Sequence, residues 1–204
     1  MIVFGDVAGY FDPLMKLVEQ VPTGLPLIFV GDLCDRGPKT KEVVSWIKDN
    51  SHASLLGNHE HMMLDFFYNK KQYGEGIWFS NGGYATARSY FPGISVDDAM
   101  ELPNKPDIWT DTLKEHLDWM QQRPLTYETE DLLISHAPHS DHEDPFEFLW
   151  NRKPPSPKDK FQIYGHNGLI KKHGDFAICI DNSRNGCLTA IDTDTKIIYK
   201  EAYR

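Results

Sequence analysis

Cysteine is scarce in this chain of 204 residues, which contains only Cys34, Cys179 and Cys187. An odd, small number without regular spacing gives no basis for a disulfide framework. Free thiols are typical of a reducing cytosol, so we expect a cytoplasmic protein. Cys34 lies inside a polar motif at a variable position, and we interpret it as a small apolar residue.

Long apolar runs are also missing, because no stretch of about 18 residues is hydrophobic enough to span a membrane. The chain starts directly with an apolar segment at residues 1–4, so we expect no signal peptide and no membrane association. Basic residues are outnumbered: 21 Lys and Arg stand against 30 Asp and Glu, a formal net charge of −9. This balance argues against non-specific nucleic-acid binding and is compatible with a monomer.

Apolar residues are nevertheless sufficient for a folded core. Hydrophobic residues make up 40% of the chain and aromatic residues 12%, which is typical of a globular protein. We see no repeats and no low-complexity segment. The length suits one substantial core, so we predict a single domain over residues 1–204.

Strand and helix patterns alternate in the first third of the chain. Apolar runs at 2–4, 25–30 and 53–56 each end at a Gly-Asp or Gly-Asn pair, and helical spacing follows at 14–21 and 43–47. Asp6, Asp32 and Asn58 are 26 residues apart, a period that fits successive βα units. Parallel strands place their carboxyl ends at one edge, so we predict that these side chains meet there.

The rest of the chain predicts helices and then strands. Residues 62–122 read as mostly helical, interrupted at 92–106, with an amphipathic helix at 113–120. We expect them to pack beside the first strands as a cap over the site. Strands are predicted at 131–135, 161–164, 177–180, 188–191 and 197–200, with a polar loop at 138–160. Asn185-Gly186 is a favoured hairpin turn between two of them. The predicted fold is α/β (α+β mixed), either one mixed sheet or a β-sandwich of mixed sheets flanked by helices.

Five polar motifs follow predicted strands: GDVAG at 5–9, GDLCDRG at 31–37, GNHE at 57–60, SHA at 135–137 and GHN at 165–167. Their possible metal donors are Asp6, Asp32, Asn58, His136 and His166. A mixed nitrogen and oxygen set without thiolate suits Mn, Fe or Zn, with Mg also possible. One such motif alone is usually a turn, but five in order at strand ends predict a metal site.

Together these motifs resemble the signature of the calcineurin-like metallophosphoesterases. The DRG and GNHE forms are similar to the phosphoprotein phosphatase branch, above all to lambda-phage-type and bacterial Ser/Thr protein phosphatases. Further matches are SNGG at 80–83 and LWNR at 149–152, and the likeness spans residues 2–192. It implies the metallophosphoesterase fold, two divalent ions with Mn as first choice, and a cytoplasmic location, in the host cytoplasm if the chain is phage-encoded.

The resemblance also implies ligand roles. Asp6 would bind the first metal, Asp32 would bridge both metals, and Asn58, His136 and His166 would complete the second site. Two ions about 3.5–4 Å apart lower the pKa of a bridging water and polarise phosphoryl oxygens. The implied reaction is direct in-line attack by metal-bound hydroxide on a phosphate ester.

A second group of residues would act on the substrate. His59, paired with Asp35, resembles the general acid that protonates the leaving oxygen. Arg36 and Arg152, together with Asn58, resemble the phosphate clamp, because a guanidinium fork matches phosphate oxygens. Without these roles, His59 would be a surface histidine at the start of a helix, and Arg152 would be an ordinary loop arginine.

Ala8 departs from the family pattern. The family has a histidine here that binds the first metal, and alanine has no donor atom. We favour a deliberate inactivating substitution; a natural variant with one tight and one weak metal, or a natural pseudophosphatase that only binds phosphate, are the alternatives. All three predict a weakened first site and a retained second site. Asn167, where near relatives have threonine, is a milder change.

The leading functional hypothesis is a Ser/Thr-type protein phosphatase that acts on a phosphorylated protein. The alternative is a hydrolase of dinucleoside polyphosphates such as diadenosine tetraphosphate, or of nucleotide or RNA-end phosphates. The aromatic residues within 73–91 either line a substrate groove or pack in the core, which we favour. The segment 139–144, HSDHED, is either a further metal site or, as we prefer, a polar loop. Lys70-Lys71 and Lys171-Lys172 are interpreted as exposed.

Overall fold

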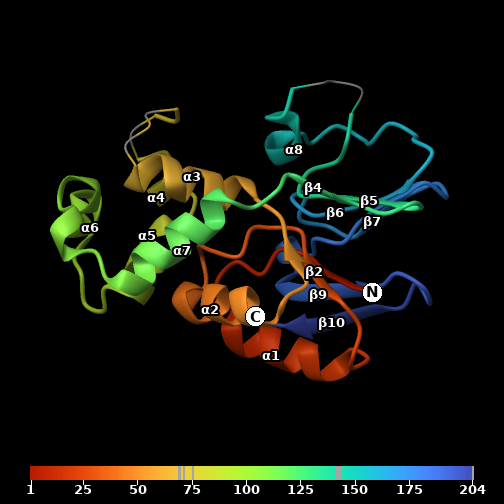
Figure 1. Cartoon of the computed structure of the whole chain (residues 1–204), viewed down its shortest axis with the longest axis horizontal. Coiled ribbons are helices and arrows are strands. Elements are labelled where there is room, and N and C mark those ends of the chain that lie inside the picture. Colours follow the sequence, from red (N-terminus) through yellow and green to blue (C-terminus); the bar gives the residue numbers. More distant parts are fainter. Residues whose placement is uncertain (69, 71, 75, 141–143, 204) are drawn as a thin grey trace.

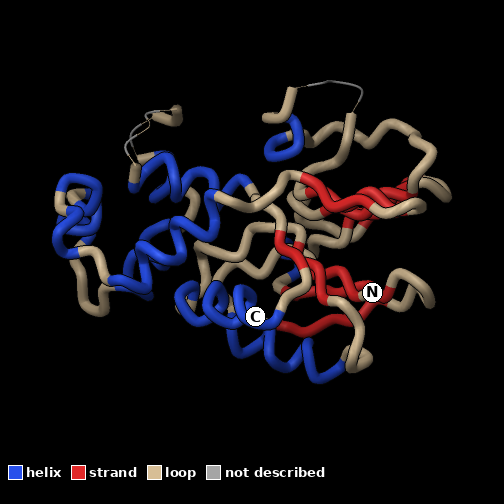
Figure 2. Tube along the Cα trace, in the orientation of Figure 1, coloured by secondary structure: helices blue, strands red, loops and turns tan. Residues whose placement is uncertain are grey.

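The computed structural model describes residues 1–68, 70, 72–74, 76–140 and 144–203. Within them, ten strands form two five-stranded sheets, in the orders β10-β9-β1-β2-β3 and β4-β5-β6-β8-β7. The sheets lie one above the other with helices outside (Figure 1), and the strands gather in two layers (Figure 2). The predicted sandwich of mixed sheets flanked by helices is confirmed.

The first sheet contains β1 (Ile2–Phe4), β2 (Leu27–Phe29), β3 (Ala53–Ser54), β9 (Cys187–Asp192) and β10 (Ile198–Ala202). The second contains β4 (Thr126–Glu128), β5 (Leu132–Ser135), β6 (Phe161–Tyr164), β7 (Lys171–His173) and β8 (Ala177–Cys179). The helices are α1 (Phe11–Gln20), α2 (Thr40–Asn50), α3 (Asn58–Phe67), α4 (Ile77–Ser80), α5 (Gly83–Tyr90), α6 (Val96–Met100), α7 (Asp111–Gln121) and α8 (Glu147–Trp150). The described residues also form three short 3-10 helices: η1 (Leu102–Asn104), η2 (Pro106–Ile108) and η3 (Ser183–Asn185).

Alternation along β1 explains why the sheets stack. Successive side chains of a strand point to opposite faces. Val3 therefore faces the second sheet and packs in a core that it shares with Ile28 and Ile134. Ile2 and Phe4 point the other way, into the larger core that α1 and α2 cover. Burial of each such side chain stabilises the fold by about 1.5–3 kcal/mol.

Parallel pairing sets the position of the functional loops. β1, β2 and β3 run parallel to each other, as predicted from their spacing. β5, β6 and β8 form a second parallel group in the other sheet. Because parallel strands end at one edge, the loops that follow these six strands gather on one side of the sandwich.

The helical region 62–122 lies to one side of the sheets (Figure 1). Its main contacts join α5 and α7 to α2, and α4 and α7 to α3. Of its described residues, only Asn81 lines the cavity that Asp6, Asp32 and Asn58 also line, so this region covers the site with one side chain and does not form the expected cap. The predicted interruption at 92–106 also contains a helix, α6, which Ser95 caps by accepting a hydrogen bond from the Asp98 N–H at 3.1 Å.

The predicted hairpin at Asn185-Gly186 is wrong. β8 pairs with β6 and β7 in the second sheet, whereas β9 pairs with β1 and β10 in the first. The segment between them crosses from one sheet to the other through η3, and Gly186 ends that turn at φ +67°. Glycine adopts this left-handed backbone without steric cost. An Asn-Gly pair thus marked a tight turn correctly but did not identify the partner strands. The short elements β4, β7 and α8 were not predicted.

No helix in the described part of the chain is long and apolar enough to cross a membrane.

His116 of α7 should make folding stability depend on pH. Its ring is buried, with Nδ1 at 2.6 Å from the Tyr90 hydroxyl and Nε2 at 3.2 Å from Ser45 Oγ. Burial lowers the pKa of His116 to about 4, below the value of about 6.5 expected in the unfolded chain. The unfolded state therefore binds a proton first as pH falls, and stability is lost between about pH 6.5 and 4.

Urea denaturation across this pH window tests the expectation. The midpoint of the His116→Gln variant should fall less steeply with decreasing pH than that of the unchanged chain. Equal slopes for the two proteins would show that His116 does not titrate in this way.

Candidate metal centre and phosphate site

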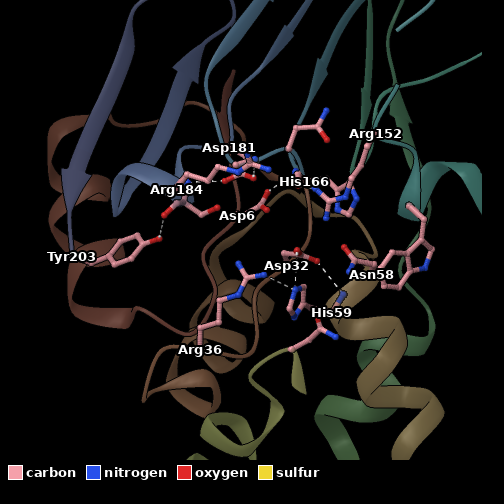
Figure 3. Close-up of a pocket in the computed structure, with 15 residues that line it drawn as sticks. Asp6, Asp32, Arg36, Asn58, His59, Arg152, His166, Asp181, Arg184 and Tyr203 are labelled. Atoms are coloured by element: carbon pink, nitrogen blue, oxygen red, sulfur yellow. Dashed lines mark hydrogen bonds and ion pairs between the residues drawn. The ribbon is translucent and has the colours of Figure 1, made fainter. Parts of the chain in front are cut away.

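Loops from both sheets converge on one cavity of about 500 Å³ (Figure 3). Each parallel strand delivers one polar side chain just after its carboxyl end. These residues are Asp6 after β1, Asp32 after β2, Asn58 after β3, His136 after β5, His166 after β6 and Asp181 after β8. The structure thus brings together all five predicted metal donors. It also places Asp181 beside them, which the sequence prediction did not assign a role.

The backbone of these loops is conformationally strained. Within the described residues, six non-glycine residues have positive φ, and five of them belong to the motifs: Ala8, Asp32, Asp35, Arg36 and His166, at +49° to +72°. Left-handed backbone costs a side-chain-bearing residue about 1–2 kcal/mol. Strain of this kind gathers where function requires a fixed geometry.

The His136 ring offers an unprotonated nitrogen to a cluster of acceptors. Its Nδ1 donates to the Val30 carbonyl at 3.1 Å, which leaves Nε2 bare in the neutral ring. Nε2 lies 2.8 Å from Asn58 Oδ1, 3.3 Å from Asp32 Oδ1 and 3.2 Å from His166 Nδ1. Burial lowers the pKa of both histidines, that of His166 to about 3. Four lone-pair donors that face each other without a proton fit a divalent cation.

Donor atoms of Asp32, His136 and His166 all lie within 4.8 Å of one another, and the three residues are buried. The residues present therefore fit the metal that the second site would hold. The carbonyl of Val30 fixes the ring of His136 as an outer partner, which is how proteins usually orient a ligating imidazole.

Asp6 occupies the other half of the cavity. Burial, then Asp181 and Asp32, raise its pKa well above the usual value, because three carboxylates are close together there. Asp6 Oδ1 accepts the His166 N–H at 3.1 Å. Gly165 permits this approach, since a Cβ at that position would lie almost on the Asp6 carboxylate. Such crowded negative charge also fits a cation.

Ala8 is anchored by its backbone in the loop that also carries Asp6. Its N–H donates to the Asp32 carbonyl at 2.7 Å, its carbonyl accepts the Gly37 N–H at 2.8 Å, and it is only 3% exposed. Residue 8 is thus fixed between the Asp6 and Asp32 loops, but its methyl group supplies no ligand. Asp6 and the shared Asp32 remain as the predicted ligands of the first site.

His59 and Asp35 form a buried pair. His59 Nδ1 lies 2.6 Å from Asp35 Oδ2, and the other Asp35 oxygen accepts from Trp78 Nε1 at 3.0 Å and from Thr86 Oγ1 at 2.9 Å. Burial opposes protonation of His59, but Asp32 and Asp35 outweigh it and raise its pKa. The pair can therefore hold a proton inside the cavity, as a general acid must.

Two arginines approach the metal donors from opposite sides (Figure 3). Arg36 Nη2 donates to His59 Nε2 at 3.0 Å, and Arg152 Nη1 donates to the His166 carbonyl at 3.0 Å. Because guanidinium only donates, Nε2 of His59 accepts in this neutral form and Nδ1 carries the proton. To act as a general acid, His59 would take a second proton on Nε2 in place of the Arg36 contact. Both arginine side chains line the cavity and are exposed to solvent.

Glu60 organises the Asp32 loop, although the sequence prediction gave it no role. Its buried carboxylate accepts the N–H groups of Asp32 at 2.7 Å, Leu33 at 2.7 Å, Cys34 at 3.2 Å and Gly57 at 2.9 Å. Burial, together with the charge of Asp32, raises its pKa to about 7. The signal was present in the GNHE motif, where a third polar residue directly after a strand needs a partner.

Replacing Glu60 with glutamine should loosen the Asp32 loop. A glutamine amide has only one acceptor oxygen, and its NH₂ group would face backbone N–H groups that also donate. Loss of an outer-shell partner typically weakens metal binding about 10–100-fold, and we expect this drop in Mn affinity by isothermal titration. An exposed control, Glu42→Gln on α2, should leave the affinity unchanged. Equal affinities for the Glu60 variant and the control would contradict this role.

The weaker sequence candidates have mixed outcomes. Trp78 and Tyr90 are buried core residues, as favoured, and Trp78 also contacts Asp35. Cys34 is fully buried, and burial raises its thiol pKa well above normal, which fits a small apolar role. The centre of the 139–144 candidate, residues 141–143, lies outside the described residues, as does Lys71. Lys70, Lys171 and Lys172 are exposed.

The chain belongs to the calcineurin-like phosphoesterase family, whose family model matches residues 1–187. The solved metallophosphoesterase from Sphaerobacter thermophilus has the same fold, with TM-score 0.61 and 13% identity over 100% of this chain and 89% of its own. A Saccharomyces cerevisiae protein serine/threonine phosphatase is similar in fold, with TM-score 0.61 and 14% identity over 100% of this chain and 79% of its own.

The similar curated proteins include tetraphosphatases and a serine/threonine-protein phosphatase. A symmetrical bis(5'-nucleosyl)-tetraphosphatase of Vibrio campbellii is 31% identical over 66% of this chain and 43% of its own length. One from Haemophilus influenzae is 28% identical over 87% of this chain and 54% of its own. Serine/threonine-protein phosphatase 1 of Salmonella typhimurium is 34% identical over 40% of this chain and 38% of its own. The chain spans about half or less of the length of these relatives.

Proposed function

We propose that this chain is a metal-dependent phosphohydrolase whose preferred substrates are dinucleoside polyphosphates. The observation that supports the chemistry is the four-donor cluster around His136 Nε2, next to the His59–Asp35 pair and two arginines in one cavity. Family membership implies divalent ions at such a cluster. Mn remains our first choice, with Fe, Zn or Mg as alternatives.

The residues divide into three roles in this proposal. Asp6 and Asp32 hold the first ion, while Asp32, Asn58, His136 and His166 hold the second. When bound, the ions lower the pKa of a water and neutralise charge on the phosphoryl oxygens. Arg36 and Arg152 orient the phosphate by charge-assisted hydrogen bonds. His59, held by Asp35, gives a proton to the leaving oxygen.

The substrate preference reverses the hypothesis that the sequence favoured. The Vibrio and Haemophilus relatives both bear the tetraphosphatase name. The Haemophilus relative matches 87% of this chain, against 40% for the Salmonella phosphatase. A Ser/Thr-type protein phosphatase of the lambda-phage or bacterial branch is therefore our second candidate. The 34% identity to the Salmonella protein over 40% of this chain supports it.

A substrate panel separates the two candidates. The Ala8→His variant, loaded with Mn, would be assayed on diadenosine tetraphosphate, a phosphothreonine peptide and p-nitrophenyl phosphate. The proposal expects kcat/KM for the dinucleotide to exceed that for the peptide by at least about tenfold, a difference of about 1.4 kcal/mol in transition-state binding. A preference for the peptide would favour the second candidate. No turnover of any of the three would point to a phosphate-binding pseudophosphatase.

A further inference from the structure

Arg184 lines the same cavity, but the proposed function assigns it no part in metal binding, phosphate binding or proton donation. In Figure 3, Arg184 and Tyr203 lie beyond Asp6, on the side of the cavity away from Asn58 and Arg152. Arg184 belongs to η3 and is exposed to solvent. Among the described residues, no carboxylate comes within ion-pair distance of its guanidinium. Its charge therefore faces the cavity without a described partner.

The position of Arg184 is set by its surroundings. Its backbone N–H donates to the Gly168 carbonyl at 3.0 Å. A Cβ on Gly168 would lie 2.6 Å from Arg184 Cγ, so the glycine leaves room for the arginine stem to cross the loop that follows His166. Gly168 also has φ +80° and gives its N–H to the Asp181 carboxylate. This glycine thus ties the Arg184 stem to the same loop that carries a metal donor.

Tyr203 completes this wall of the cavity. Its hydroxyl donates to the Ser183 carbonyl at 3.2 Å, next to Arg184. Its ring stacks on Tyr10 with centroids 3.8 Å apart. The segment after β10 is therefore fixed against the turn that carries Arg184, and the cavity extends along this wall beyond the metal donors.

The charge balance indicates what this wall binds. Three arginines, Arg36, Arg152 and Arg184, reach the cavity from three separate loops of a chain whose net charge is −9. Two guanidinium forks and the metal ions are enough for the oxygens of one phosphoryl group. A third guanidinium on the opposite wall is suited to a further anionic group of the same ligand.

We propose that Arg184, positioned by Gly168 and the Ser183–Tyr203 contact, binds a second phosphate of the substrate beside the one that is cleaved. This subsite would make the enzyme prefer ligands with linked phosphates over phosphate monoesters. It deepens the proposed function and rests on it for the position of the cleaved phosphate.

Competitive inhibition tests the subsite without turnover of a dinucleotide. The probes are methylenediphosphonate, which has two linked phosphonates, and orthophosphate. Their inhibition constants would be measured against p-nitrophenyl phosphate, using the Ala8→His protein with excess Mn. We expect Arg184→Gln to raise the constant for methylenediphosphonate at least about tenfold more than that for orthophosphate, the worth of one charge-assisted contact. Arg184→Lys, which keeps the charge, should recover part of the loss.

A matched control removes the same charge elsewhere. Arg88 is exposed on α5 and does not line the cavity, so Arg88→Gln should leave the ratio of the two constants unchanged. Equal effects of Arg184→Gln on both probes, no effect on either, or the same ratio change in Arg88→Gln would overturn the subsite. If the substrate panel instead favours the phosphopeptide while Arg184→Gln still removes the diphosphonate preference, the subsite stands and the proposed substrate fails.

Discussion

Replacing Ala8 with histidine should raise Mn-dependent hydrolysis of p-nitrophenyl phosphate at least about tenfold, the lower end of what perturbing a metal site usually changes. Ala8 lies between the Asp6 and Asp32 loops, and its N–H is bonded to the Asp32 carbonyl. An imidazole at this position is expected to supply the missing ligand of the first site.

The backbone at residue 8 suits this substitution. Its φ is +49°, a region in which histidine is several-fold enriched among non-glycine residues. Ala8→Gly is the matched control, because it relieves the backbone strain without adding a donor atom. A gain in Ala8→His with no comparable gain in Ala8→Gly would assign the effect to the ligand. Equal activities of Ala8→His and the unchanged chain would refute the interpretation of Ala8 as an inactivating change.

Replacing His59 with glutamine in the Ala8→His protein should lower kcat by about 10²–10⁴-fold on a substrate with a poor leaving group, the usual range for general acid catalysis. Asp35 holds Nδ1 of His59 at 2.6 Å and keeps the other nitrogen toward the cavity. A phosphothreonine peptide or a dinucleotide needs a proton on its leaving oxygen. The nitrophenolate of p-nitrophenyl phosphate is stable without one, so its hydrolysis should fall much less.

This leaving-group dependence separates proton transfer from simple damage to the site. Asp35→Asn should give the same pattern more weakly, because it leaves the ring in place but removes the charge that favours the imidazolium. Melting temperatures of both variants would be compared, since Asp35 is buried with three hydrogen-bond partners. A uniform loss on all substrates would argue against the general-acid role and for a structural one.

The sequence predicted the parallel strands correctly, because their regular spacing coincides with polar residues at the strand ends. The 26-residue spacing of Asp6, Asp32 and Asn58 indicated parallel βα units, and the structure has them. The two later donors, His136 and His166, also follow parallel strands, and they meet the first three at the cavity. Strand ends that carry polar residues are informative because burying those residues is costly unless they are used.

The sequence-based prediction was wrong where it had to say which strands pair with each other. Asn185-Gly186 marked a turn, but nothing local indicates that β8 and β9 belong to different sheets. Glu60 was read only as part of a motif and Asp181 was given no role, because the backbone groups that they bind lie in loops that only the fold brings near. The strained φ angles of the motif residues are likewise set by tertiary contacts and have no signature in the sequence.

Counting bound Mn in the unchanged chain and in Ala8→His tests the central claim, a complete second metal site beside a first site that lacks one ligand. Isothermal titration should find one tight ion in the unchanged chain and two in the variant. Electron paramagnetic resonance should show an isolated Mn²⁺ signal in the former and spin coupling between two ions in the latter. Two ions of equal affinity in the unchanged chain, or none, would contradict the account.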